Sequence, residues 1–234
     1  MHIPDGFLDP RLSGGLAGIA ALALSYCFAR VKQMATAVVP QAVLATVGKG
    51  VGNMVSGMRS VLTAPGERFI YKMGMAASLV FAAQMFNFPV SQGTSGHLIG
   101  GVFASVILGP FAGAVVIAVV LAVQSLFFAD GGLLALGANI VNMALVAALG
   151  CYYLYYWLKK FAPEWLAVFA AAWISVVLAS FLCALELGFS GTIPFAAVIP
   201  AMVKVHSVIG IAEGLITLAL IQLFYVMLKE PEQQ

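Results

Sequence analysis

Long apolar runs separated by short polar breaks divide the chain into seven segments, each of which predicts a helix. A helix needs about 20 apolar residues to cross a hydrocarbon layer of roughly 30 Å, and most of the runs come close to this length. The run that starts at His97 is short, so it crosses fully only if the preceding loop is drawn into the membrane. The predicted helices lie at about residues 12–29, 73–88, 97–108, 111–128, 133–157, 165–187 and 205–228.

The composition places these helices in a membrane. Of the 234 residues, 62% are hydrophobic and 9% are charged, and the mean hydropathy is +1.04. A globular chain has roughly 45–50% apolar and about 25% charged residues. So little charge also argues against a disordered protein and against a nucleic-acid binder. We therefore predict an all-α, polytopic membrane protein that forms one membrane domain over residues 1–234.

The positions of lysine and arginine predict an N-terminus outside and a C-terminus in the cytoplasm, because basic residues concentrate on the cytoplasmic side of a membrane. With seven crossings, this orientation leaves only Arg11 and Lys204 outside. The other nine of the 11 basic residues lie inside: Arg30, Lys32, Lys49, Arg59, Arg68, Lys72, Lys159, Lys160 and Lys229. The opposite orientation would reverse this distribution.

The segment 33–67 is mildly apolar and does not fit the series of crossings. If it crossed the membrane, every later helix would be inverted and the charge asymmetry would be lost. We expect a cytoplasmic or interfacial loop here that holds an amphipathic helix.

Two common chemistries find no support in the sequence. The chain has no GxxxxGK[ST] motif, so any ATP hydrolysis must come from a partner. The three cysteines, Cys27, Cys151 and Cys183, are far apart inside apolar runs, where a thiol acts as a small hydrophobic group. We expect them to pack in the core, without a disulfide or a ligand role.

The first ten residues predict a metal-chelating segment. Their sequence begins Met1-His2, and no basic stretch precedes the first apolar run, so we expect no signal-peptide cleavage. The Met1 amine, the deprotonated His2 amide and His2 Nδ1 can close adjacent five- and six-membered rings around one ion. Three nitrogens in a plane suit Ni²⁺, Cu²⁺ and, less commonly, Co²⁺, whereas Zn²⁺ prefers a tetrahedron and Mg²⁺ prefers oxygen.

The fourth nitrogen of such a site has two candidates, because the chain holds three histidines. His97 follows a turn rich in Gly, Ser and Pro on the predicted outer side, and His206 lies near the outer end of the last predicted helix. Glycines let the backbone approach an ion closely, which favours His97. Position alone does not choose between them.

Four stretches of the chain resemble the CbiM/NikM family, the substrate-capture proteins of energy-coupling-factor transporters for cobalt and nickel. They are Met1-His2-Ile3-Pro4-Asp5-Gly6-Phe7-Leu8, the region 81–98 with its Thr94-Ser95-Gly96-His97 motif, Asp130-Gly131-Gly132 with Gly137-Ala138-Asn139, and 206–214. The first stretch and the Thr-Ser-Gly-His motif are specific to the family, and the four together span nearly the whole chain.

The resemblance implies a seven-helix bundle whose N-terminal segment folds back into the core. It implies that Met1, His2 and His97 hold Ni²⁺ or Co²⁺ as the transported substrate, which selects His97 over His206. It further implies a transmembrane coupling subunit and ATP-binding subunits as partners in a prokaryotic plasma membrane. Some members of the family carry extra C-terminal helices, so we also expect a separate small accessory membrane subunit. Cobalt uptake of this kind supplies cobalamin biosynthesis.

Polar side chains within the predicted helices provide candidates for an outer layer around the ion, because such groups usually face a bundle interior. His206 and Glu213 are seven residues apart on one helix face, and we expect them to hydrogen-bond to each other. Asn139 and Asn142, together with Ser95, are expected to support the ligands. Glu186 is expected to be solvated at the outer interface.

Two other functions remain open at this point. The histidines and Glu213 would also suit an intramembrane redox or proton-carrying subunit. A secondary transporter would need no ATPase, but the sequence has no inverted repeat or pair of broken helices to favour it.

Overall fold

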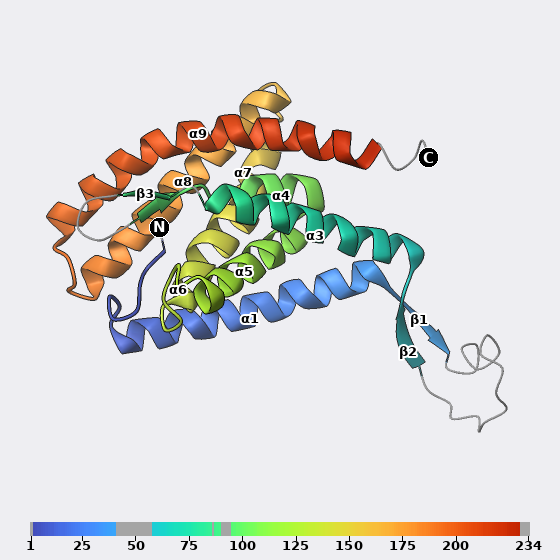
Figure 1. Cartoon of the computed structure of the whole chain (residues 1–234), viewed down its shortest axis with the longest axis horizontal. Helices are drawn as coiled ribbons and strands as arrows, with labels where there is room; N and C mark the ends of the chain where they lie inside the picture. The colour runs from blue at the N-terminus through green and yellow to red at the C-terminus, as the bar shows by residue number, and fades with distance from the viewer. Residues whose placement is uncertain (1, 41–57, 86, 90–94, 230–234) are drawn as a thin grey trace.

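The computed structural model describes residues 2–40, 58–85, 87–89 and 95–229, and it consists almost entirely of helices (Figure 1). The helical elements are α1 (Pro10–Ala35), α3 (Ala64–Gln84), α4 (Gly101–Leu108), α5 (Pro110–Phe127), α6 (Leu136–Ile140), the π-helix η2 (Val141–Gly150), α7 (Cys151–Leu158), α8 (Glu164–Phe189) and α9 (Phe195–Lys229). The strands are β1 (Thr36–Pro40), β2 (Met58–Leu62), β3 (Asn87–Pro89) and β4 (Ser95–His97).

Within the described part of the chain, five helices are long and apolar enough to cross a membrane. They are α1, α5, the continuous helix formed by α6, η2 and α7, α8, and α9. The prediction of an all-α, multi-pass membrane protein is confirmed. The other two predicted segments fold as α3 and α4, and α4 has only 8 residues.

Two helices begin earlier than their apolar runs predict. Helix α3 begins at Ala64 rather than near residue 73, because the Thr63 side chain accepts a hydrogen bond from the Gly66 amide at 3.0 Å and so caps its first turn. The charged residues of its first turns hid this start from a reading based on hydropathy. Helix α9 begins at Phe195 rather than near residue 205, and it accommodates Pro200 in its interior.

Close packing of small residues holds the bundle together. A Cβ added to Gly137 would lie 2.4 Å from Ala17 Cα, so α6 and α1 approach to a distance that only glycine permits. At the centre, α5 buries alanine and valine side chains on most of its surface. Such contacts drive helix association in lipid, where no hydrophobic effect operates between helices. The three cysteines are buried and unpaired, as expected for packing residues.

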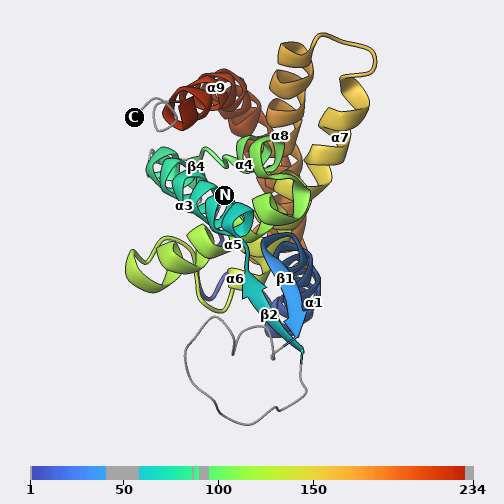
Figure 2. The ribbon, with the colours of Figure 1, turned by 90° about the vertical axis from the view of Figure 1, so that its right-hand side faces the viewer.

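The segment 33–67 contains no helix in its described part beyond the end of α1 and the start of α3. Instead, β1 pairs with β2 in an antiparallel ladder from Thr36↔Leu62 to Pro40↔Met58. The two strands extend away from the bundle at the ends of α1 and α3 (Figure 2). The amphipathic helix expected in this loop would fall on residues 41–57, which lie outside the described residues.

A second antiparallel ladder and the segment before α1 together position the candidate site. Strands β3 and β4 pair with Asn87 opposite His97. The segment before α1 turns at Gly6, whose φ of +83° favours glycine, and runs back along the bundle towards β4 (Figure 1). Residues that are distant in sequence therefore meet inside the bundle.

Candidate metal site

The backbone of Ile3 is held in register by the side chain of Asn139. The Ile3 amide donates to Asn139 Oδ1 at 2.9 Å, and Asn139 Nδ2 donates to the Ile3 carbonyl at 3.3 Å. The same carbonyl accepts a hydrogen bond from the Gly132 amide at 2.9 Å. Both Ile3 and Asn139 are buried. These bonds fix the position of Ile3 in the bundle, and a role of Asn139 in supporting metal ligands stays a prediction.

Further contacts hold residues 5–9 against the loops that precede α6 and follow α8. Asp5 Oδ1 accepts a hydrogen bond from the Leu134 amide at 2.7 Å, and a Cβ on Gly132 would lie 2.2 Å from that oxygen. The Thr192 hydroxyl donates to the Phe7 carbonyl, and the Asp9 amide donates to Ser190 Oγ at 3.0 Å. The N-terminal segment is therefore held in a defined position against the helix bundle.

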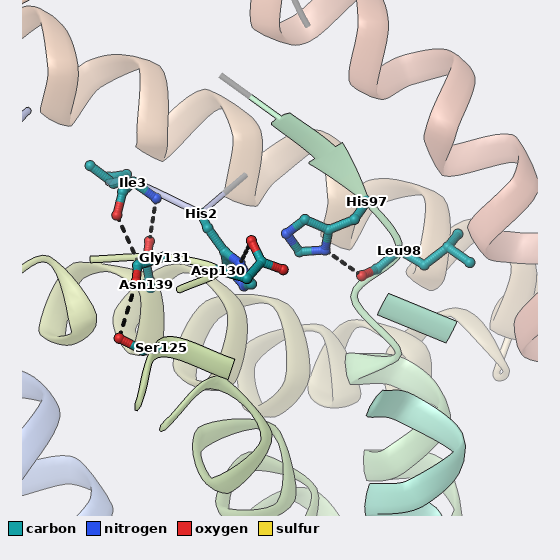
Figure 3. A network of polar contacts seen from close by, with 8 residues as sticks. All are labelled: His2, Ile3, His97, Leu98, Ser125, Asp130, Gly131 and Asn139. Carbon is teal, nitrogen blue, oxygen red and sulfur yellow. Dashed lines mark hydrogen bonds and ion pairs between the residues drawn. The ribbon is translucent and has the colours of Figure 1, made fainter. Parts of the chain in front are cut away.

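The rings of His2 and His97 meet inside the bundle, with centroids 4.3 Å apart and planes inclined at 50° (Figure 3). His2 comes from the N-terminal segment and His97 from β4, and the two residues are 5% and 0% exposed. The Nε2 atoms of both rings are buried and have no hydrogen-bond partner among the described residues. Because a buried polar atom without a partner is costly, two such nitrogens in neighbouring rings indicate a place for a ligand.

The tautomer of His97 follows from its one hydrogen bond. Nδ1 lies 2.7 Å from the Leu98 carbonyl oxygen, which only accepts, so Nδ1 carries the proton and donates. Nε2 then presents its lone pair. This is the arrangement of a metal-ligating histidine, in which the second ring nitrogen is fixed by a backbone carbonyl.

His2 has a partner that the analysis of the sequence did not assign to the site. Its Nδ1 donates to Asp130 Oδ1 at 2.8 Å. The predicted chelate uses this same Nδ1, so the imidazole must leave Asp130 when it binds an ion in that way. The Asp130 side chain is 27% exposed, so water can replace the imidazole there. A carboxylate directly after a predicted crossing, in the motif Asp130-Gly131-Gly132, was the signal that would have identified it.

Burial controls the protonation of both imidazoles. It lowers the pKa of His2, although the hydrogen bond to Asp130 acts in the opposite direction. It lowers the pKa of His97 well below the usual value, and the nearby His2 and His206 add to this effect. Both rings are therefore neutral at pH 7 and available as ligands without loss of a proton.

The predicted hydrogen bond between His206 and Glu213 is wrong. His206 Nδ1 instead bonds to the Met202 carbonyl at 2.8 Å, one turn earlier on α9. Glu213 accepts hydrogen bonds from the amides of Ile99 and Gly100, at 2.9 and 2.8 Å. A shared helix face does not bring two side chains together when each of them has another partner within reach.

Two further polar residues differ from expectation. Glu186 is buried rather than solvated, and it accepts a hydrogen bond from Asn142 Nδ2 at 2.8 Å. Asn142 thus binds α8, and within the described part of the chain no hydrogen bond joins it to His2 or His97. Ser95 pairs with Pro89 in the β3–β4 ladder, but its side chain lies outside the described part of the structure, as does Met1.

No group of three or more His, Cys, Asp or Glu side chains that suits a metal occurs among the described residues. An ion held by the two imidazoles would need donors of another kind, and the sequence predicts the backbone nitrogens at the start of the chain as those donors.

Replacing Asn139 by leucine is expected to release the N-terminal segment. The change keeps a similar volume but leaves the buried Ile3 amide without its acceptor, which costs about 1–3 kcal/mol. Amide hydrogen exchange of residues 3–8 should accelerate by about tenfold or more. Asn142→Leu is the matched control, because it also removes an asparagine side chain from the next turn of the helix. That side chain donates to Glu186 and not to Ile3. Equal acceleration of exchange in both variants would contradict the role of Asn139 in holding Ile3 in place.

Comparison with known proteins supports a shared origin over the whole chain. The CbiM family profile, described as the cobalt uptake substrate-specific transmembrane region, matches residues 34–230. The chain is 34% identical to a putative fused nickel transport protein NikMN of Archaeoglobus fulgidus over 99% of its own length and 67% of the relative. It is 30% identical to a probable fused nickel transport protein LarMN of Lactiplantibacillus plantarum, over 95% and 63% of the two lengths.

A cobalt transport protein CbiM of Geobacter sulfurreducens is 29% identical over 65% of this chain and 46% of the relative. The chain thus spans about two thirds, or less, of these relatives. A crystal structure of a transition metal transporter superposes with a TM-score of 0.74 and 26% identity, over all of this chain and 95% of that one. The match over residues 34–230 shows that the chain belongs to the CbiM family, as its resemblance in sequence predicted.

Proposed function

We propose that this chain is the substrate-capture subunit of an ATP-driven energy-coupling-factor importer for Ni²⁺ or Co²⁺. The observation that carries the proposal is the pair of neighbouring buried imidazoles, of which His97 presents an Nε2 atom without a partner among the described residues. Membership of a family described by cobalt uptake, and relatives named as nickel or cobalt transport proteins, support the identity of the ion. The chain binds the ion from outside and carries out no chemistry on it.

Four nitrogens hold the ion in this proposal: the Met1 amine, the His2 amide, His2 Nδ1 and His97 Nε2. The imidazole of His2 turns about its Cβ–Cγ bond and its proton moves from Nδ1 to Nε2, so that Nδ1 leaves Asp130 and presents a lone pair to the ion. The anchors on Ile3 keep the backbone in place during this rotation. A planar set of four nitrogens favours Ni²⁺ and low-spin Co²⁺ over Zn²⁺ or Mg²⁺.

Release of the ion to the cytoplasm requires partners. We infer a transmembrane coupling subunit, ATP-binding subunits that hydrolyse the nucleotide, and a small accessory membrane subunit. Two relatives are named as fused nickel transport proteins, and these names support the last of these. The assembly lies in the prokaryotic plasma membrane, with the metal site near its outer face.

Calorimetric titration of the purified chain with Ni²⁺ tests this proposal. One ion should bind per chain and release about two protons at pH 7: one from the His2 amide and most of one from the amine, whose ordinary pKa is about 7.7–8.0. The imidazoles contribute none, because burial lowers the pKa of both. Affinity should therefore fall as the pH falls.

Titrations in two buffers with different ionisation enthalpies give the number of protons. A redox or proton-carrying subunit would bind no stoichiometric nickel or cobalt, and that result would contradict the proposal. Release of no protons would mean that the amine and amide are not ligands, even if the two imidazoles bind the ion.

A further inference from the structure

The carboxylate of Glu213 on α9 binds the backbone that follows His97. Glu213 Oε2 accepts a hydrogen bond from the Ile99 amide at 2.9 Å, and Oε1 accepts one from the Gly100 amide at 2.8 Å. Glu213 is 2% exposed, so water does not compete for these bonds. Both oxygens of one carboxylate thus hold two consecutive peptide groups.

The same backbone is also held by α3. Gln84 Nε2 donates to the Ile99 carbonyl at 2.6 Å, so both polar groups of Ile99 are bound by side chains of different helices. Gly100 adopts a left-handed φ of +70°, and a Cβ there would meet Val80 Cγ2 at 2.8 Å. The chain therefore turns sharply after Ile99 and has no room to shift.

These contacts determine where the His97 ring lies. His97 donates through Nδ1 to the carbonyl of Leu98, so the orientation of its ring depends on the peptide group between Leu98 and Ile99. The nitrogen of that peptide group is the one that Glu213 binds. A change at Glu213 is thus transmitted to the imidazole through one peptide unit.

We propose that Glu213 is a positioning residue for His97: its two backbone hydrogen bonds fix the Leu98–Ile99 peptide and thereby aim His97 Nε2 at the ion. The inference rests on the proposed function, since it assumes that His97 is a ligand. It also links the metal site to α9, a helix of 35 residues that extends along the length of the bundle (Figure 1). Glu213 does not touch the ion.

A double-mutant cycle of Glu213→Gln and His97→Ala, with Ni²⁺ affinity as the readout, tests this role. Glutamine keeps the shape but presents an NH₂ group to one of the two backbone amides, so one hydrogen bond is lost. We expect Glu213→Gln to weaken Ni²⁺ binding about 10- to 100-fold, as is typical of residues that orient a ligand. In the His97→Ala background, the same change should have no further effect, because no imidazole is left to position. The visible absorption of bound Ni²⁺ should shift in the same way in the two single variants.

Glu186→Gln is the matched control, because Glu186 is a second buried carboxylate that bonds to Asn142 and not to the His97 backbone. It should leave Ni²⁺ affinity unchanged. If Glu213→Gln does not give a monodisperse protein, Glu213→Asp enters the cycle instead, since it keeps the charge but shortens the reach.

The outcomes separate this inference from the proposed function. Unchanged affinity in Glu213→Gln, or an equal loss in both backgrounds, would overturn the positioning role while leaving His97 as a ligand. Unchanged affinity in His97→Ala would remove the fourth ligand of the proposed site, and this inference with it. A loss in Glu186→Gln as large as in Glu213→Gln would mean that any buried charge has the effect, which also overturns the role.

Discussion

A chain extended by three residues before Met1 is expected to lose Ni²⁺ and Co²⁺ binding by more than about a hundredfold. The extension moves the α-amine away from the ion, and loss of a direct donor exceeds the 10- to 100-fold effect of an outer partner. The hydrogen bonds on the Ile3 amide and carbonyl prevent the N-terminal segment from sliding outward to make room for the added residues. Equilibrium dialysis with nickel analysis measures the loss.

Three residues are preferable to one for this experiment. A single added residue makes the histidine third in the chain, where an amine, two amides and an imidazole form a new four-nitrogen chelate. The same extension placed after Gln234 is the control and should leave binding intact. A protease that cuts directly before Met1 should restore affinity to the extended chain. Undiminished binding before cleavage would refute a role for the free amine.

Replacing His97 by alanine is expected to weaken Ni²⁺ binding by about a hundredfold and to shift the visible absorption of the ion that remains. The change removes the fourth nitrogen but leaves the chelate of Met1 and His2. His97 is fully buried, so its loss also lowers thermal stability. Affinity and melting temperature must therefore be measured together.

His206→Ala provides the matched comparison. His206 is buried to the same degree as His97, and its Nδ1 is likewise bound to a backbone carbonyl. Its replacement should lower the melting temperature without changing Ni²⁺ affinity. If His206→Ala weakens binding and His97→Ala does not, the fourth ligand has been assigned to the wrong histidine.

The helices were predictable because membrane helices carry their own signal, a run of apolar residues about as long as the bilayer is thick. That signal marks the residues inside the hydrocarbon layer, but a helix can extend beyond them. It therefore missed the start of α3, where Thr63 caps a turn that contains charged residues, and the start of α9, which lies before Pro200. The strands β1 and β2 lie within the segment 33–67, whose sequence carries no comparable pattern.

The site was partly predictable for a different reason. His2 and His97 are rare residue types whose chemistry limits their use, and the structure brings their rings together. The contacts of Asp130 with His2 and of Glu213 with its partners were not predictable, because they join residues more than 100 positions apart in the chain. Helix periodicity relates residues on one helix, so it suggested that Glu213 bonds to His206 and missed the backbone that follows β4.

A crystal structure of the chain loaded with Ni²⁺, with anomalous diffraction recorded at the nickel edge, tests the central claim most directly. We predict one anomalous peak beside the imidazole of His2, in a plane with the Met1 amine, the His2 amide, His2 Nδ1 and His97 Nε2, and with Asp130 released from His2. A peak at His206, or an ion held by His2 and His97 with the amine turned away, would contradict the account.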